Sequence, residues 1–465
     1  MAPKKKKAEK VVPKKYADQQ WFWGLITEAE AEKELKSMDD GAFLLRSTVS
    51  DGTTTIIVSF VTRNKDENKE TVHRIISLTD KRWILEGRND KHSTIVELIT
   101  YYQDHSVENG TKLLQGKNKP SWFLKHNDVI AGENAPVLGA GNFSSVVLGK
   151  YMKKEVAVKK LFAKEEALLK EKEALMKEAR VMEKLKHHFI IRFFGVAIDA
   201  MPPLIIMELM AGGLLSHLKK HGPDIKNGEK LLYCWQLSCA LAYCAEKKIV
   251  HRDLAARNCL FSKYGILKLT DFGMADHEAN LIAYCTIQDQ MPARWMPPDA
   301  VLPTATFNER TDVWSFAVTC NEIFGNGEQP LSHMTETSEV MKALRGNKPD
   351  NGELHICPSD VPQEFVTLLK KCWSWENGDR PNFAEIQTML DMLLKNKYPP
   401  PPIDEMTVCS IKNAKPLTIA EYEIVIQNHL DSEESDDDNG DCSNNERVTL
   451  NERKTVLKKR STSKV

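Results

Sequence analysis

The sequence lacks any apolar run of the ~18–20 residues that a membrane-spanning helix needs. Its lysine-rich beginning contains no apolar segment of the kind found in secretory signal peptides, and Ala2 replaces the glycine that N-myristoylation requires. The formal net charge is only −1, which argues against a protein whose main partner is nucleic acid. These absences predict a cytoplasmic protein, and they leave open a peripheral position at the inner membrane surface or a nuclear fraction.

Cysteine pairs of the Cys-x-x-Cys type are also missing, although the chain has 10 cysteines. Cys234, Cys239 and Cys244 are spaced five apart on an expected helix, so successive side chains point ~140° away from each other. That geometry is poor for a shared metal ion. We therefore expect reduced thiols in the core of a cytosolic protein.

Composition divides the 465 residues into five segments. The chain is long enough for two or three domains, each with its own core. Its charged and polar ends are of the kind that stays solvated. The expected segments are a basic disordered arm over 1–20, an α+β domain over 21–115, a linker over 116–130, a larger domain over 131–396 that is β-rich and then helical, and a mostly disordered tail over 397–465.

Two short motifs of the larger domain indicate phosphoryl transfer. HRDLAARN (251–258) follows a helical segment, and DFG (271–273) begins 13 residues after Asn258, as in protein kinases. Phosphoryl transfer builds charge on oxygen atoms, so it needs a carboxylate that orients the acceptor hydroxyl and hard oxygen ligands for a metal. Asp253 is the expected catalytic base, and Asn258 and Asp271 are the expected Mg²⁺ ligands.

Two further motifs precede these: LGAGNFSSV (138–146) and VAVK (156–159). Two glycines let backbone amides approach a triphosphate, although Gly-x-Gly also marks ordinary hairpins. Lys159 is either a surface lysine at a strand end or a ligand of the phosphates. The helix expected over 164–186 favours the second interpretation, because Glu178 on that helix can pair with Lys159 and fix its direction.

Residues 131–396 resemble a protein-tyrosine kinase domain over their whole length, and the likeness continues through MPARWMPPD, DVWSF and CWSWENGDRP. The resemblance implies a bilobal fold with a β-rich small lobe and a helical large lobe. It implies ATP and Mg²⁺, or alternatively Mn²⁺, as cofactors. Ser144 departs from the pattern, because it replaces the third glycine of the loop. The residues that the resemblance assigns to the nucleotide are Leu138, Gly139, Ala140, Gly141, Asn142, Phe143, Ser144, Ser145, Val146, Ala157, Lys159, Met207, Glu208, Met210 and Leu260.

The same resemblance implies tyrosine as the acceptor. The AARN run places Arg257 just before the metal-binding asparagine, and residues 292–295 match the segment that seats a phenol. Arg257 accordingly joins the expected catalytic set, and Tyr284 is the expected activation-loop phosphorylation site. Asp299 replaces the usual glutamate in an ion pair with Arg380, so this pair must form with one methylene less.

The smaller domain carries an arginine inside an apolar strand. Arg46 lies in FLLRST (43–48), where an unpaired charge would cost several kcal/mol, so it needs a buried anionic partner. With WFWG (21–24) and His73, residues 21–115 resemble an SH2 domain, which has a central antiparallel sheet flanked by two helices. The expected strands and helix cover residues 42–47, 54–62, 71–77 and 93–104.

The SH2 resemblance implies that the anion is the phosphate of phosphotyrosine. Arg46 would bind it, and Thr48 and His73 would complete the pocket. The alternative is an internal ion pair between Arg46 and an acid such as Glu97. Glu28 stands where many SH2 domains have a second phosphate-binding arginine. A carboxylate there would repel phosphate if it pointed inward, so we expect a weak pocket.

The order of the two domains resembles the C-terminal half of the Fes/Fer subfamily of non-receptor tyrosine kinases, without the membrane-bending domain of its longer members. Residues 1–20 are too few for the SH3 domain of other subfamilies. The implied partners are protein tyrosine substrates and phosphotyrosine proteins, and the basic arm is a candidate for contact with anionic lipid. The short linker predicts docking of the SH2 domain near the Glu178 helix. The alternative function is a phosphotyrosine-dependent scaffold with an inactive kinase fold.

Overall fold

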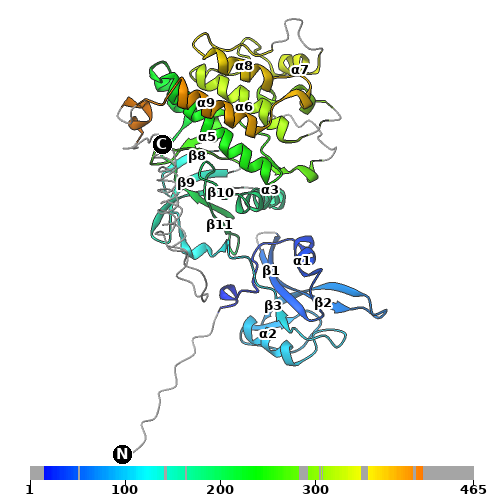
Figure 1. The fold of residues 1–465 in the computed structure, drawn as a ribbon. Coiled ribbons are helices and arrows are strands. Elements are labelled where there is room, and N and C mark those ends of the chain that lie inside the picture. The colour runs from blue at the N-terminus through cyan, green and yellow to red at the C-terminus, as the bar shows by residue number, and fades with distance from the viewer. Residues whose placement is uncertain are drawn as a thin grey trace, which may run out of the picture. The chain divides into compact units, whose positions relative to one another are not determined.

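The first domain, the small lobe and the large lobe follow one another along the chain (Figure 1). Among the described residues, no helix has both the length and the apolar composition to cross a membrane. The computed structural model describes residues 15–50, 53–132, 134–140, 144–162, 165–281, 292–302, 305, 307–346, 354–401 and 405–411.

The first domain is built on one 5-stranded sheet in the order β4-β3-β2-β1-β5. Strands β1 to β4 pair with one another in antiparallel fashion, and β5 is parallel to β1. The central strands cover the expected positions and extend beyond them by up to three residues at an end, because they are rich in the β-branched and aromatic residues that favour strands. The elements are α1 (Glu28–Leu35), β1 (Ala42–Ser50), β2 (Thr53–Arg63), β3 (Lys69–Thr79), β4 (Arg82–Leu85), α2 (Ile95–Asp104) and β5 (Gln115–Gly116).

Alternation along β1 separates a core face from a pocket face. Phe43 and Leu45 are buried in the cluster that includes Leu98 of α2. Arg46 therefore points to the other face, where α1 lies. Helix α1 begins at Glu28 because the side chain of Thr27 accepts a hydrogen bond from the Glu30 amide, in a reciprocal capping box.

The small lobe is a 7-stranded sheet in the order β6-β11-β12-β10-β9-β7, with β8 paired to β9. Its core consists of aliphatic side chains such as Val156, Val158 and Ile206. The elements are β6 (Phe123–Leu124), β7 (Val129–Ile130), β8 (Val137–Ala140), β9 (Ser144–Tyr151), β10 (Lys154–Leu161), α3 (Glu165–Glu183), β11 (Phe193–Ala197) and β12 (Leu204–Glu208).

The segment expected as a linker, 116–130, is part of the fold. Strand β6 pairs with β11 and strand β7 pairs with β9, so the segment contributes strands to the small-lobe sheet. The end of the expected basic arm is also ordered: residues Tyr16–Asp18 form a short 3₁₀ helix, and the ring of Tyr16 packs edge-on against Phe22 at 5.1 Å.

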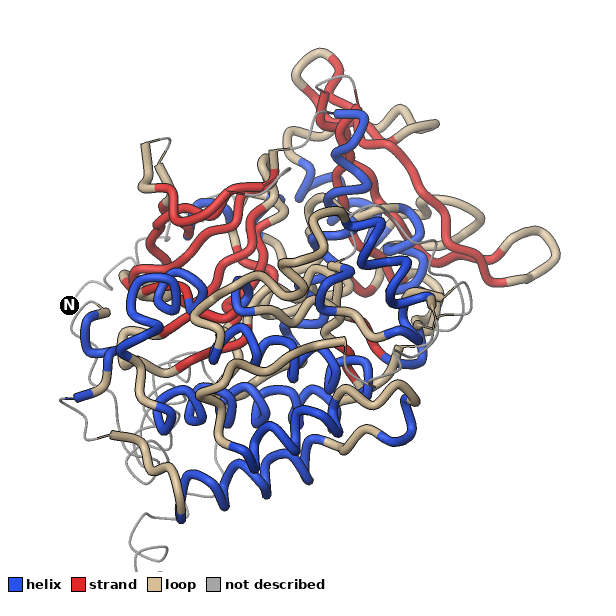
Figure 2. Tube along the Cα trace, turned by 90° about the horizontal axis from the view of Figure 1, so that it is seen from above, coloured by secondary structure: helices blue, strands red, loops and turns tan. Residues whose placement is uncertain are grey.

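The large lobe is mainly helical, and its helices are drawn in blue in Figure 2. Cys234, Cys239 and Cys244, all on α5, are free thiols. The elements are β13 (Gly212–Gly213), α4 (Leu214–His221), α5 (Asn227–Glu246), β14 (Ile249–Val250), β15 (Cys259–Phe261), β16 (Leu267–Leu269), β17 (Asp276–His277), α6 (Glu309–Phe324), α7 (Thr337–Arg345), α8 (Gln363–Cys372) and α9 (Phe383–Asn396).

Candidate active site and phosphate-binding pocket

An ion pair joins the sheet of the small lobe to its helix. Lys159 on β10 donates from Nζ to both carboxylate oxygens of Glu178 on α3, at 2.9 and 2.7 Å. Burial lowers the pKa of Lys159, but the carboxylates of Glu178 and Asp271 outweigh that effect, so its pKa lies above the ordinary value. The ammonium group is therefore charged at neutral pH and held in one direction.

The loop between β14 and β15 brings Asp253, Arg257 and Asn258 together. The Asn258 amide donates to the Asp253 backbone carbonyl at 2.7 Å and to its carboxylate at 2.8 Å. The Arg257 guanidinium pairs with the other carboxylate oxygen of Asp253. Burial raises the pKa of Asp253, and the positive charge of Arg257 partly offsets this. The aspartate is thus fixed in position and made more basic than a solvated one.

Asp271 lies beside the same loop. The amide and hydroxyl of Thr270 donate to the Asn258 carbonyl at 2.9 and 3.0 Å, which joins the end of β16 to the catalytic loop. Asp271 itself has φ of +61°, a conformation that costs a non-glycine residue free energy. A Cβ built on Gly273 would lie 3.3 Å from the Asp271 Oδ1 atom and 3.8 Å from Glu178 Oε2. Asp271 and Glu178 therefore lie close together around Gly273, and Asp271 directly follows the residue that is bonded to the Asn258 carbonyl.

Two buried groups hold this arrangement from below. His251 lies 3.1 Å from the Thr270 carbonyl through Nε2, and its ring packs edge-on against Phe272 at 4.8 Å. The carboxylate of Asp312 on α6 accepts from the amides of His251 at 2.7 Å and Arg252 at 3.0 Å. The available sequence signal for this role was Asp312 itself, an acidic residue directly before the buried run Val313–Cys320 of α6.

The resemblance places Val146, Ala157, Met207 and Leu260 around adenine, and they come from four strands, β9, β10, β12 and β15. Ala157 on β10 and Met207 on β12 are direct partners in the sheet, and both are buried. Leu260 lies on β15, where it pairs with Gly213. The side chain of Glu208 is not directed at a ligand, because it accepts from Lys268 Nζ at 2.7 Å.

The expected glycine loop is described only at its two ends. Residues Val137–Ala140 form β8, and Gly139 and Ala140 pair with Val146 and Ser145 of β9. Gly141, Asn142 and Phe143 lie outside the described residues.

Arg257 of the catalytic loop stacks on a tryptophan. The guanidinium of Arg257 lies 4.5 Å from the ring centroid of Trp295. Arg294 donates to four backbone carbonyls between residues 330 and 335, so it orders a loop and does not point towards a substrate. Tyr284 lies outside the described residues.

The ion pair expected between Asp299 and Arg380 is present. Arg380, which is fully buried, pairs with Asp299 Oδ1, and Asp299 Oδ2 accepts from the Asn377 amide at 2.9 Å. A carboxylate with one methylene less therefore still reaches the arginine.

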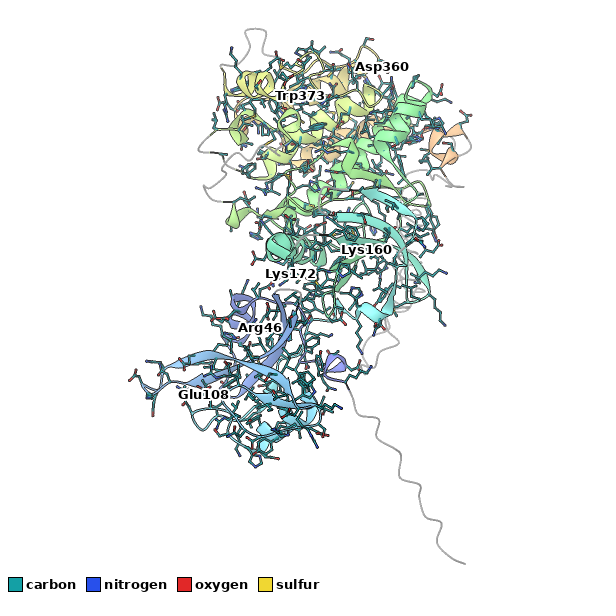
Figure 3. All side chains as sticks on the ribbon, turned by 180° about the vertical axis from the view of Figure 1, so that it is seen from behind. Arg46, Glu108, Lys160, Lys172, Asp360 and Trp373 are labelled. Carbon is teal, nitrogen blue, oxygen red and sulfur yellow. The ribbon has the colours of Figure 1, made fainter. Side chains whose placement is uncertain are left out.

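The pocket face of the first domain centres on Arg46, which is 4% exposed (Figure 3). Its Nε donates to the hydroxyl of Ser59 at 3.1 Å, and the same hydroxyl lies 2.8 Å from His73 Nδ1. Thr48 is half-buried on the same face of β1, two residues further on. Ser59 was not expected; its signal was a polar residue in the middle of an apolar strand.

An internal acid reaches this arginine, but it is not Glu97. The Glu97 carboxylate accepts from the Ser93 amide at the start of α2. Glu28 Oε2 instead lies 3.4 Å from Arg46 Nη2. The internal pair considered from the sequence is thus present with a different carboxylate, and Arg46 also keeps its place in the pocket.

The first domain also contacts the small lobe directly. Glu30 on α1 accepts from Lys172 at 3.1 Å and from Arg180 at 3.0 Å, both on α3. The Leu25 amide donates to the Ile198 carbonyl at 2.7 Å. We call the contacts made by Glu30 and by Leu25 the junction. The two basic partners of Glu30 lie on α3, the helix that carries Glu178.

Lys159, Asn258 and Asp271 provide the donor set that a metal-bound nucleotide requires. The two hydrogen bonds donated by the Asn258 amide nitrogen leave its oxygen as the acceptor, and Asp271 adds a carboxylate. Hard oxygen ligands suit a small divalent cation, and Lys159 supplies a fixed positive charge for phosphate. These residues fit ATP together with a divalent metal.

Comparisons with known proteins agree with this geometry. Residues 133–390 match the protein tyrosine and serine/threonine kinase family, and residues 21–102 match the SH2 domain. The chain is 30% identical over 387 residues to human tyrosine-protein kinase Fer. These residues cover 82% of the chain and 44% of Fer. It is 31% identical over 393 residues to the transforming protein Fps of avian sarcoma virus (strain PRCII), covering 83% of the chain and 69% of Fps.

A third relative has nearly the same extent as the matched region. Fer-related kinase 1 of Caenorhabditis elegans is 31% identical over 390 residues, which cover 81% of the chain and 94% of that protein. By contrast, the chain spans less than half the length of the Fer proteins from human and rat.

Proposed function

Because this chain belongs to the SH2-containing tyrosine-protein kinases of the Fes/Fer family, we propose that it transfers the γ-phosphoryl group of ATP to tyrosine side chains of proteins. The observation that supports the proposal is that the charged groups expected for this reaction interact with one another. Lys159 is paired with Glu178, Asp253 is held by Asn258, and Asp271 lies beside both groups.

Each residue has a physical role in this reaction. Lys159 binds the α- and β-phosphates, and Glu178 keeps its ammonium directed at them. Asp253 orients the phenolic hydroxyl and accepts its proton, and its raised pKa favours that transfer. Asn258 and Asp271 hold the metal, which we assign as Mg²⁺ with Mn²⁺ as the alternative; when bound, it neutralises charge on the phosphate oxygens.

The test is phosphate transfer from Mg-ATP to a generic tyrosine polymer. Asp253→Asn should lower the rate at least roughly 100-fold, the usual contribution of a positioned base, without loss of fold. Asp224→Asn, which removes an exposed carboxylate of the same lobe, is the matched control and should leave the rate unchanged. Equal and negligible transfer by the wild type and Asp253→Asn would instead favour the scaffold with an inactive kinase fold.

We also propose that the first domain binds phosphotyrosine peptides through Arg46, with Ser59, Thr48 and His73 around it. The support is a buried guanidinium on a strand face that opens towards α1. Arg46→Ala should weaken binding of a phosphotyrosine peptide roughly 10- to 100-fold, because a charge-assisted contact contributes ~1.5–3 kcal/mol. Arg82→Ala removes an exposed arginine and is the control; indistinguishable affinities of all three proteins would reject this role.

The junction supports a third proposal: docking of the SH2 domain on α3 helps to activate the kinase. Glu30 binds Lys172 and Arg180 on the helix whose Glu178 orients Lys159. Lys172 is only 3% exposed, so this pair is better shielded from solvent than a surface pair. Loosening the junction while both domains stay folded is therefore expected to reduce kinase activity.

The basic arm supports a proposal about location. We assign a cytoplasmic location, with the lysines of residues 1–20 as the candidate contact for anionic lipid. Residues 1–14 lie outside the described residues. Sedimentation with phosphatidylserine vesicles, compared with uncharged vesicles, tests this contact, and equal sedimentation would reject it.

A further inference from the structure

The first residue of α1 reaches into the phosphate pocket. Glu28 Oε2 lies 3.4 Å from Nη2 of Arg46, while Nε of the same guanidinium is bound by the Ser59 hydroxyl. The Arg46 side chain is 5% exposed and the Glu28 side chain is 63% exposed. The carboxylate thus approaches the arginine from the solvent side, which is the side from which a phosphopeptide must enter.

A second carboxylate lies one helical turn further along α1. Nε2 of His73 is 3.8 Å from Glu28 Oε1 and 3.6 Å from Glu32 Oε1. One ligand atom of each of these three residues can be chosen so that all lie within 4.8 Å of one another. Burial lowers the pKa of His73, so its ring is protonated less readily than a solvated imidazole. Arg46 pairs with the Glu28 carboxylate, and its charge is also affected by that of Glu32.

This arrangement changes the physics of phosphate binding. A phosphate dianion that reaches Arg46 must displace the Glu28 carboxylate from Nη2, and it then lies beside two negative charges. Displacement is feasible, because Glu28 is largely exposed and can turn into solvent without leaving a buried charge unpaired. The capping box of α1 uses Thr27 and Glu30, so the helix does not depend on Glu28.

We propose that Glu28 is an intramolecular occupant of the phosphate subsite and sets the affinity of the SH2 domain for phosphotyrosine. The inference rests on the proposed phosphotyrosine-binding function and deepens it. Glu28 stands where many SH2 domains have a second phosphate-binding arginine. In this chain it competes with the ligand for Arg46. Binding then requires a ligand whose other contacts offset the displacement, so an isolated phosphotyrosine binds poorly and a complementary peptide binds well.

The test uses the full chain and a fluorescent peptide with one phosphotyrosine between uncharged residues, in buffer with EDTA. Fluorescence anisotropy should show that Glu28→Gln binds about 10-fold more tightly than the wild type, because the amide keeps the shape but loses the charge. Glu34→Gln, on the same helix but with no contact to Arg46, is the matched control and should bind like the wild type. Adding Arg46→Ala to Glu28→Gln should abolish the gain.

The outcomes separate the two proposals. If Glu28→Gln and the wild type bind equally while Arg46→Ala binds weakly, the phosphotyrosine-binding function stands and the occupant role is wrong. If neither the wild type nor Glu28→Gln binds the peptide, both proposals fail. If Glu28→Gln and Glu34→Gln raise the peptide affinity equally, the cause is the net charge of the domain, and the occupant role is wrong. The occupant role is also wrong if added Zn²⁺ or Mg²⁺ strengthens wild-type binding and Glu28→Gln removes that gain, because the carboxylates would then hold a metal for the phosphate.

Discussion

At the scale of single residues, Glu322 connects the segment that contains Trp295 to the catalytic loop that contains Asp253. Its carboxylate on α6 accepts from Trp295 Nε1 at 2.7 Å and from the Ala256 amide at 3.0 Å. Trp295 in turn stacks under Arg257, which pairs with Asp253. One buried carboxylate therefore bonds to both the segment that carries Trp295 and the loop that carries Asp253.

Glu322 should also make stability depend on pH. Burial raises its pKa from 4.5 to about 7, so the folded state holds this proton more tightly than the unfolded state. The stability contribution of this group is present in full below about pH 4.5 and is lost as pH rises through about 7. We expect the free energy of unfolding in urea to fall more between pH 5 and pH 8 for the wild type than for Glu322→Gln. Parallel pH profiles for the two proteins would contradict this.

At the scale of elements, the start of the expected tail is a folded strap. We use that name for residues 405–411, which include the short 3₁₀ helix Thr407–Ser410. The buried Glu229 on α5 accepts from the amides of Thr407 at 3.0 Å and Val408 at 3.1 Å. Val408 is fully buried. The expectation of a mostly disordered tail over 397–465 does not describe these residues.

The strap should contribute to the stability of the large lobe. Val408→Asp would place a carboxylate in an apolar site next to that of Glu229, and we expect a loss of about 3 kcal/mol in the free energy of unfolding. Ser410→Asp adds the same charge at an exposed position of the strap and is the control, with an expected change under ~1 kcal/mol. Urea unfolding measures both, and equal losses would show that charge, and not burial, is responsible.

The linker shows the same lesson for strands. Sequence length suggested a short connector over 116–130, and its composition gave no strand pattern. In the structure, two-residue strands there pair with β11 and β9. Such short pairings depend on the neighbouring strand, because two residues carry too little alternation to be recognised in isolation.

At the scale of the whole molecule, Gly24 allows the two domains to approach closely at the junction. Gly24 has φ of +70°, and a Cβ built on it would lie 2.3 Å from the Ile198 carbonyl oxygen. The neighbouring Leu25 amide donates to that same carbonyl. Only a residue without a side chain fits against the small lobe here.

Gly24→Ala should therefore loosen the junction. Gly87→Ala is a matched control, because Gly87 has nearly the same φ of +74° and no atom within 4 Å of an added Cβ. We expect faster hydrogen exchange at the Leu25 amide and a several-fold lower kinase rate for Gly24→Ala than for Gly87→Ala. Equal rates for the two variants, with faster exchange only in the first, would show that docking does not assist the kinase.

The sequence by itself determined the family, the fold class and the candidate catalytic set. HRDLAARN, DFG, VAVK and the FLLRST strand are local patterns, and each places its functional residue by spacing alone. The periodicity of the rest of the sequence also located the main strands and helices. A buried face of a strand or helix repeats apolar residues at a fixed spacing.

Only the tertiary structure decided which distant groups pair. Four pairings join residues that are far apart in the chain or lie on different elements. They are Glu28 with Arg46, Asp312 with the catalytic loop, Glu322 with Trp295, and Glu229 with the strap. The sequence shows that a buried charge needs a partner, but several acids are available to each. The choice among them depends on distance and shielding from water, and these exist only after the chain has folded.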